Sequence, residues 1–195
     1  MILLASASAS RATLLRSAGV AFEAVSSGVD EAEIKARLLK AGEGPAAIAE
    51  TLAEAKALAI SSGDRRLVIG ADQTLDLDGE LVDKAACAEE ARDRLRQLRG
   101  RAHVLHSAAA LARNGVIVWR TTSSPRMTMR EFSDDFLEDY LARQGEAVLS
   151  SVGCYHLEGQ GVQLFERVEG DQFAVLGLPL IDLLAALRRE GALDL

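Results

Sequence analysis

The sequence has few aromatic residues, cysteines and histidines. Aromatic residues make up 4% of its 195 residues, and there are two cysteines and three histidines. Cys87 and Cys154 lie far apart without a CxxC spacing, which argues against a disulfide framework or a zinc site and predicts reduced thiols. The spacing of three between His103 and His106 points them to opposite faces of a predicted strand. The two histidines are therefore not expected to chelate one ion together.

Basic residues are fewer than acidic residues. There are 22 lysines and arginines against 29 acidic residues, which gives a net charge of −7. Polymeric nucleic acid and anionic membranes need a basic surface, so neither is expected as a partner, whereas a small anionic ligand stays open. No apolar run reaches the 18 residues of a membrane span, and the N-terminal apolar run lacks the basic region of a signal peptide. We therefore expect a cytoplasmic protein.

Apolar residues, at 49%, are sufficient for a full core in a single domain over residues 1–195. Strands and helices alternate, and Asp78-Gly79 and Asn114-Gly115 are hairpin signals, which together predict an α/β fold with a mixed, twisted sheet flanked by helices. Strands are expected over 2–5, 22–25, 67–71, 74–77, 80–82, 103–112 and 116–130, and helices over 14–18, 46–61, 88–99, 133–144 and from 179. Residues 26–45 are expected to be loop with one helical turn, and 153–175 to be strand-like.

A serine-rich loop follows the first predicted strand, with Ser6, Ser8 and Ser10 before Arg11. Backbone N–H groups and the dipole at a helix start favour an anion, and a guanidinium binds phosphate bidentately. The pattern is compatible with a phosphate-binding loop, although no GxxxxGK[ST] sequence occurs. Local sequence by itself favours a simpler interpretation, in which Ser10 caps a helix and Arg11 is solvated.

Asp72 is predicted to end the apolar strand 67–71. Ligands of open α/β sheets bind beyond the carboxyl ends of strands, where a carboxylate can hold Mg²⁺ or activate water. The alternative is a turn residue that closes the strand, and the local sequence does not separate the two. Gln73, beside it, can hydrogen-bond a base edge or be solvated.

Lys56 lies on the apolar stripe of the helix 46–61. An ammonium on an inward face is costly unless it is paired or snorkels, so Lys56 either reaches solvent or faces an anion-binding groove. Lys84 could reach the same groove. Asp30 and Glu31 form an acidic pair that suits metal binding or is ordinary surface charge.

The segment 75–80, Leu-Asp-Leu-Asp-Gly-Glu, is similar to the DxDG nucleophile loop of haloacid-dehalogenase-type phosphatases. That loop normally follows an apolar strand near the start of the domain and continues with Thr or Val. Here Glu80 follows and the segment lies in mid-chain. A hairpin turn is the better interpretation, and a phosphomonoesterase using Asp76 and Asp78 is kept as an alternative.

Taken together, the segments resemble the Maf family of nucleoside triphosphate pyrophosphatases. The matching blocks are LASASASR at 4–11 with LL at 14–15, VDE at 29–31, AEAKA at 53–57, IGAD at 69–72, DGE at 78–80 with Lys84, GCY at 153–155, LFER at 164–167 and GLPL at 177–180. They follow the family order over almost the whole chain, so the resemblance is specific.

The resemblance implies an inosine-triphosphatase-like α/β fold with two lobes around a deep groove, and commonly a homodimer. It also implies hydrolysis of a nucleoside triphosphate to the monophosphate and pyrophosphate with a divalent cation, Mg²⁺ or Mn²⁺. By matching positions, Asp72 is the proton acceptor and, with Glu31, a metal ligand. Triphosphate binding is assigned to Ser6, Ser8, Arg11, Lys56 and Lys84, and nucleotide selectivity to Ser10, Gln73 and Glu158.

Gln73 and the blocks at 157–159 and 164–167 are more similar to the 7-methyl-GTP branch than to the dTTP/UTP branch, which typically has Thr after the Asp. Ser10 departs from that branch, which tends to have an aromatic residue there, and Ala9 and Ala85 replace family prolines. A non-catalytic nucleotide sensor that acts on cell division through a protein partner is a further alternative. The net charge of −7 favours a bridging cation between carboxylates and phosphates.

Overall fold

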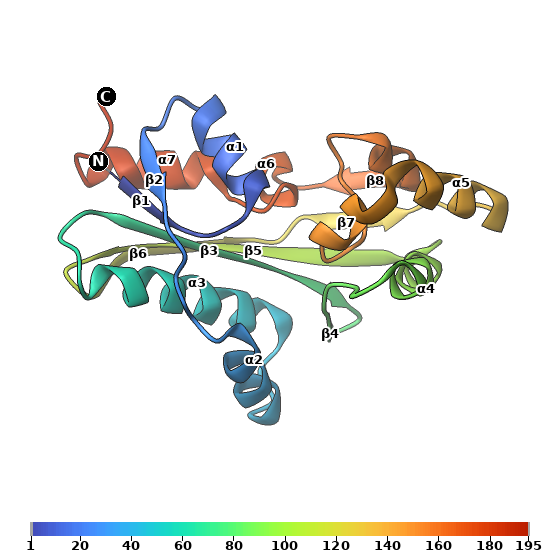
Figure 1. The fold of residues 1–195 in the computed structure, drawn as a ribbon, viewed down its shortest axis with the longest axis horizontal. Helices are drawn as coiled ribbons and strands as arrows, with labels where there is room; N and C mark the ends of the chain where they lie inside the picture. Colours follow the sequence, from blue (N-terminus) through green and yellow to red (C-terminus); the bar gives the residue numbers. More distant parts are fainter. Residues whose placement is uncertain (1, 195) are drawn as a thin grey trace.

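The computed structural model describes residues 2–194. Its mixed sheet has eight strands with helices on both faces (Figure 1), as the sequence predicts. The strands are β1 Ile2–Ala5, β2 Phe22–Ala24, β3 Val68–Leu77, β4 Glu80–Val82, β5 Ala102–Arg113, β6 Val116–Ser123, β7 Arg126–Met129 and β8 Phe165–Glu169. The helices are α1 Ala9–Ser17, α2 Glu31–Lys40, α3 Pro45–Ser61, α4 Ala88–Leu98, α5 Asp134–Gln144, α6 Gln172–Val175 and α7 Leu180–Arg189, with 3₁₀ turns at Gly145–Ser150 and Gln160–Leu164.

The strand order places a loop beside the middle of the longest central strands. The sheet runs β2-β1-β3-β5-β7-β8, with β4 paired to β3 and β6 to β5. β1 is parallel to β2 and β3, and it ends at Ala5 opposite Gly70, whereas β3 continues to Leu77 along the antiparallel β5. The segment that follows β1 therefore lies next to the stretch of β3 that begins at Ala71.

Helix α3 covers one face of the sheet through small side chains (Figure 1). Three alanines of α3 pack on three alanines of β5, namely Ala49, Ala53 and Ala57 on Ala108, Ala110 and Ala112. A Cβ on Gly70 would lie 2.1 Å from the carbonyl oxygen of Ala53, so only glycine permits this approach. The close contact brings Lys56 of α3 directly over β3.

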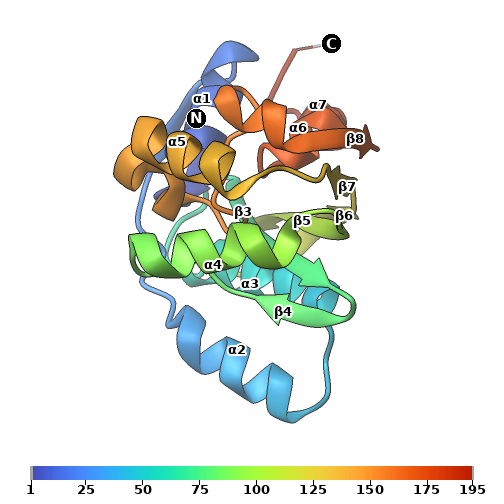
Figure 2. The ribbon, with the colours of Figure 1, turned by 90° about the vertical axis from the view of Figure 1, so that its right-hand side faces the viewer.

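Two other apolar cores lie at the two ends of β3 and β5. On the face opposite α3, leucines of α7 pack with Leu15, Ile69 and Leu111. At the far end, α4 and α5 enclose a second core (Figure 2), in which His103 Nε2 lies 2.6 Å from the Tyr155 hydroxyl. Burial lowers the pKa of His103 to about 4. His106 instead contacts Asp76 and Ser124, so the two histidines face different neighbours, as their spacing predicts.

The expectation of a loop over 26–45 is wrong, because residues 31–40 form α2. Asp30 caps this helix by accepting a hydrogen bond of 2.9 Å from the backbone N–H of Glu33. Acidic residues in the first turn and basic ones in the last match the helix dipole. No residue of α2 is buried, but Ile34 and Leu38 are four apart and partly buried, so a short apolar stripe was present in the sequence and was not recognised.

Three strand predictions also need correction. The strand at 67–71 does not end before Asp72 but continues through Gln73 to Leu77. The segment 116–130 is divided into β6 and β7, with Pro125 between them. Within 153–175 only β8 is a strand, and the rest consists of turns, the 3₁₀ turn Gln160–Leu164 and α6. The helices at 46–61, 88–99 and 133–144 and the hairpins at 78–79 and 114–115 are confirmed to within a residue or two. None of the helices within residues 2–194 combines the length and hydropathy that bilayer crossing requires.

Candidate active site

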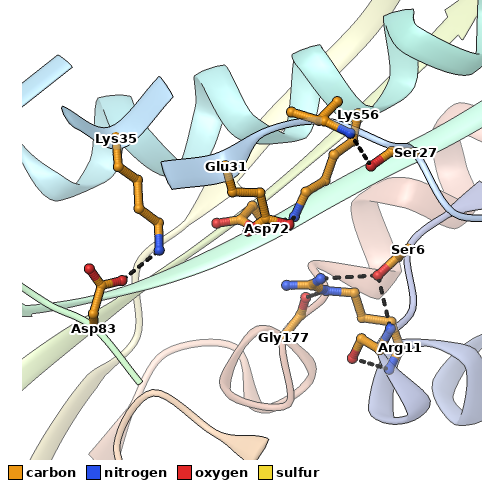
Figure 3. A network of polar contacts seen from close by, with 11 residues as sticks. Ser6, Arg11, Ser27, Glu31, Lys35, Lys56, Asp72, Asp83 and Gly177 are labelled. Carbon is orange, nitrogen blue, oxygen red and sulfur yellow. Dashed lines mark hydrogen bonds and ion pairs between the residues drawn. The ribbon is translucent and has the colours of Figure 1, made fainter. Parts of the chain in front are cut away.

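A buried lysine joins two carboxylates at the centre of the site (Figure 3). Lys56 Nζ lies 2.6 Å from Asp72 Oδ1 and 2.7 Å from Glu31 Oε1. The Lys56 and Asp72 side chains are 6% and 9% exposed, whereas that of Glu31 is 46% exposed. Lys56 therefore neither snorkels nor stands alone. Its charge neutralises a buried carboxylate, and Glu31 at the start of α2 closes the pair from the solvent side.

Asp72 reaches this position from the middle of β3 rather than from its end. It pairs with Ala108 of β5, and its side chain points to the sheet face that α3 covers, the face on which Gly70, two residues earlier, lets α3 approach. The strand that does end here is its parallel neighbour β1. The rule that ligands bind beyond the carboxyl ends of strands therefore applies to β1 and not to β3. Asp72 lies on β3, next to the segment that follows the end of β1.

The serine loop is folded around a buried guanidinium (Figure 3). Arg11 Nη1 donates to Ser6 Oγ at 3.2 Å, and Nε donates to the carbonyl oxygen of Gly177 at 2.9 Å. Burial lowers the pKa of Arg11, while the charges of Asp72 and Glu31 oppose that shift. Because the Arg11 guanidinium is already buried, it can bind a phosphate without a further cost of desolvation.

The simpler interpretation of this loop is wrong on both points. Arg11 is buried and not solvated, and the cap of α1 is Ser8, whose hydroxyl accepts from the Arg11 backbone N–H at 3.4 Å. Ser10 lies within the helix, where its hydroxyl donates to the carbonyl oxygen of Leu176 at 3.0 Å. Ser6 and Ser8 thus shape the loop, and Ser10 attaches it to the chain after α6.

Gln73 points to the face of the sheet opposite Asp72, because neighbouring residues in a strand alternate. Its amide Nε2 donates to Ser107 Oγ at 2.8 Å and to the carbonyl oxygens of Ala174 and Val175 at 3.0 and 3.1 Å. Backbone carbonyls accept only, so the NH₂ end of the amide must face them. The Oε1 atom is then the end left for a ligand. Ser107 is a residue that sequence reasoning missed, since a serine in an alanine-rich strand gives no local signal.

The other predicted residues are not joined to this centre. Lys84 and Glu158 are exposed, and within residues 2–194 neither forms a hydrogen bond or an ion pair. Asp83, next to Lys84, pairs with Lys35 of α2 at 2.5 Å (Figure 3). A cavity of about 200 Å³ between α3 and β6, lined by residues that include Glu50 and Arg120, contains none of the predicted site residues.

Asp76 and Asp78 have structural partners in the β3–β4 hairpin. Asp76 Oδ1 accepts from the Gly79 backbone N–H at 2.6 Å, and its Oδ2 lies 3.3 Å from His106 Nε2. Asp78, at a φ of 57°, pairs with Arg101 at 2.5 Å. These contacts confirm the hairpin turn. They do not resemble two free carboxylates converging on one phosphate.

The carboxylates of Asp72 and Glu31 suit a divalent metal ion in one respect. They offer two hard oxygen ligands that lie 2.6 and 2.7 Å from one ammonium, and Mg²⁺ is usually held by one or two carboxylates together with substrate phosphates. Across the described residues, no group of three or more His, Cys, Asp or Glu side chains is arranged to hold a metal. The donor set therefore fits an ion that is shared with a phosphate ligand, not one held by protein alone.

Fold and site together define an α/β protein in which a serine loop and the first turn of α1, with the buried Arg11, lie beside a buried carboxylate. A family model described as Maf-like protein matches residues 1–190. The chain is 55% identical over 192 residues to the nucleoside triphosphate pyrophosphatase of Caulobacter vibrioides, covering 98% of this chain and 96% of that protein. It is 48% identical over 195 residues to the 7-methyl-GTP pyrophosphatase of Rhizobium meliloti, covering 100% and 98%. For the 7-methyl-GTP pyrophosphatase of Brucella abortus the identity is 45% over 194 residues, covering 99% and 98%. The chain belongs to the Maf family, which confirms the family predicted from its sequence.

Proposed function

We propose that this protein hydrolyses a nucleoside triphosphate to the monophosphate and pyrophosphate. The observation that carries the proposal is the buried Asp72–Lys56–Glu31 group next to a loop that holds Arg11. Together they offer one carboxylate, Asp72, that can accept a proton, and two cations, Lys56 and Arg11, that can offset the negative charge of phosphate. Membership of a family with nucleoside triphosphate pyrophosphatases at 55% identity supports the same reaction class.

In the proposed reaction, water attacks the α-phosphorus. The new bond joins the water oxygen to that phosphorus, the bond to the α–β bridging oxygen breaks, and pyrophosphate leaves with the electron pair. Asp72 takes the proton of the attacking water, and Lys56 fixes its carboxylate through the 2.6 Å contact. Arg11 and Lys56, together with Lys84 as the family resemblance assigns it, offset charge on the phosphate oxygens, which is the main demand of phosphoryl chemistry.

Asp72 and Glu31 are the residues that would hold a divalent cation. When bound, Mg²⁺ or Mn²⁺ supplies charge neutralisation of the triphosphate and lowers the repulsion between phosphates and this acidic chain. Lys56 compensates one of these two negative charges, with contacts of 2.6 and 2.7 Å, so the three groups together keep a charge of +1 − 2 = −1. The remaining ligands of the ion would come from the substrate.

The substrate we favour is a purine triphosphate of the 7-methyl-GTP type, because relatives at 45–48% identity carry that activity in their names. Gln73 supports this choice, since its free Oε1 is an acceptor and a guanine edge offers N–H donors. We assign base contacts to Gln73 and Glu158, with Ser10 beside them, and place the nucleotide in a groove between two lobes. A dTTP/UTP preference is the alternative. A cytoplasmic location and a homodimer complete the proposal.

The deciding experiment is incubation with a panel of nucleoside triphosphates and Mg²⁺, with both products identified. Pyrophosphate and monophosphate in equal amounts support the proposal. Orthophosphate would instead favour the phosphomonoesterase alternative, and tight binding without turnover at any metal concentration would favour a nucleotide sensor.

We expect removal of divalent metal to abolish turnover. Dialysis against a chelator should lower the rate by at least about a hundredfold, because the charge on the leaving pyrophosphate is then offset only by side chains. Added Mg²⁺ or Mn²⁺ should restore the rate. The thermal melting temperature should change little, because the contacts of Lys56 with both carboxylates do not need the ion. Full turnover in the presence of chelator would contradict this expectation.

Replacing Gln73 by Thr, the residue of the other branch, should change the ranking of substrates. The Gln73 Oε1 acceptor is lost, and we expect the kcat/KM ratio of 7-methyl-GTP to dTTP to fall about tenfold, as for one lost hydrogen bond to a base. The same ratio in Gln163→Thr, an exposed glutamine outside the predicted site, serves as the control. An unchanged ratio in Gln73→Thr would show that the base contact is wrongly assigned.

A further inference from the structure

Four consecutive backbone carbonyls, in the last two residues of α6 and the two residues after it, each accept a hydrogen bond from a side chain of another element. We call residues 174–177 the α6–α7 junction. Ala174 O accepts from Ser107 Oγ at 2.6 Å and from Gln73 Nε2 at 3.0 Å, and Val175 O accepts from Gln73 at 3.1 Å. Two strands, β3 and β5, therefore hold the first half of the junction.

The second half of the junction, Leu176 and Gly177, holds the first turn of α1, which follows the serine loop; we call these two segments, residues 6–11, the phosphate loop. Leu176 O accepts from Ser10 Oγ at 3.0 Å, and Gly177 O accepts from Arg11 Nε at 2.9 Å. Gly177 has a φ of +99°, a conformation that only glycine adopts without strain. This backbone conformation directs the Gly177 carbonyl towards Arg11 Nε. The direction of the Arg11 guanidinium is set by this carbonyl on one side and by Ser6 on the other.

Ser107 is the residue that completes the network. It is fully buried, it donates its one hydroxyl hydrogen to Ala174 O, and a lone pair accepts from Gln73 Nε2 at 2.8 Å. Removing the hydroxyl deletes the 2.6 Å contact from β5 to the junction and leaves Gln73 Nε2 to hold the carbonyls of Ala174 and Val175 by itself, so we expect the junction to shift.

We propose that Ser107 is a positioning residue for the phosphate loop: it fixes the α6–α7 junction, which in turn orients Arg11 towards the triphosphate. Ser107 contacts neither Arg11 nor the Asp72–Lys56 pair, so it acts through the junction alone. This inference rests on the proposed function for the identity of the anion. It assigns Ser107 to the polyphosphate end of the substrate and not to its base.

The test uses inorganic tripolyphosphate, which has the phosphate chain but no base. Its affinity is measured by calorimetry with Mg²⁺ for the wild type, for Ser107→Ala and for the matched control Thr74→Val. Thr74 lies on the opposite side of β3 and also donates a buried hydroxyl to a backbone carbonyl, that of Pro45, at 2.9 Å. We expect Kd to rise about tenfold in Ser107→Ala and to change less than twofold in Thr74→Val.

A double variant with Arg11 distinguishes a positioning effect of Ser107 on Arg11 from a general loss of structure. In Arg11→Lys the Nε–Gly177 contact is absent, so adding Ser107→Ala should weaken tripolyphosphate binding by less than twofold more. A tenfold further loss in the double variant would overturn the proposal, as would unchanged affinity in Ser107→Ala. If Ser107→Ala does not fold, the half-buried Gln73→Met replaces it and should show the same tenfold rise; unchanged affinity there would also overturn the proposal.

The two proposals fail in different ways. Tripolyphosphate binding that depends on Ser107 and Arg11, without pyrophosphate release from any nucleotide, would refute the proposed function and leave the role of Ser107 standing. Turnover with no dependence of tripolyphosphate affinity on Ser107 would do the reverse.

Discussion

Asp72→Asn is expected to reduce pyrophosphate release by about 10²–10⁴-fold, the usual contribution of a general base. The amide is nearly isosteric with the carboxylate, but it cannot take a proton from water. Lys56 keeps its 2.7 Å contact with Glu31, so the local charge stays partly compensated. KM should therefore change much less than kcat, measured with the best nucleotide of the panel.

The control for this variant is Asp76→Asn, on the same strand. Asp76 is engaged by the Gly79 backbone and by His106, outside the proposed site, so we expect its activity to stay within about threefold of the wild type. A phosphomonoesterase that used Asp76 and Asp78 predicts the reverse order. Loss of activity in Asp76→Asn with little change in Asp72→Asn would refute our assignment of the base.

Lys56→Met is expected to cost about 3–5 kcal/mol of unfolding free energy, because it leaves the buried Asp72 carboxylate without its partner. The methionine fills nearly the same space, so the loss is electrostatic rather than a cavity effect. Glu31 is 46% exposed and can be hydrated, whereas Asp72 at 9% cannot. Urea unfolding gives the free energy, and turnover should fall with the misplaced base.

Two further variants make the Lys56 prediction specific. Lys35→Met removes an exposed ion pair with Asp83 and should cost no more than about 1 kcal/mol. The double variant Lys56→Met/Asp72→Asn removes both buried charges and should recover most of the lost stability, while staying inactive. Equal losses in Lys56→Met and Lys35→Met would mean that the Asp72–Lys56 pair is not a buried charge pair in solution.

Local patterns predicted those parts of the fold that bury an apolar stripe or end at a turn residue. The helix at 46–61 and the hairpins at 78–79 and 114–115 are of this kind. Helix α2 buries no residue, but the four-residue spacing of Ile34 and Leu38, its cap and its end charges could have indicated it. The length of β3 was missed because the polar residues Asp72 and Gln73 interrupt an apolar run, although both are paired with β5.

The site was predictable in its residue types but not in its geometry. Lys56 was predicted either to reach solvent or to face an anion-binding groove, and it pairs with Asp72, sixteen positions away in sequence. The placement of Gln73 on the far face of β3, and its attachment to the α6–α7 junction, depend on contacts between positions about 100 apart. Such long-range pairings leave no trace in local periodicity, and Ser107 has no distinguishing pattern of its own.

The position of the attacked phosphorus tests the central claim most directly. Turnover of the best nucleotide in H₂¹⁸O with Mg²⁺, analysed by mass spectrometry, shows which product carries the water oxygen. Attack at the α-phosphorus puts one ¹⁸O into the nucleoside monophosphate and none into pyrophosphate, which is the result we predict. Label in pyrophosphate, or in released orthophosphate, would contradict the proposed reaction.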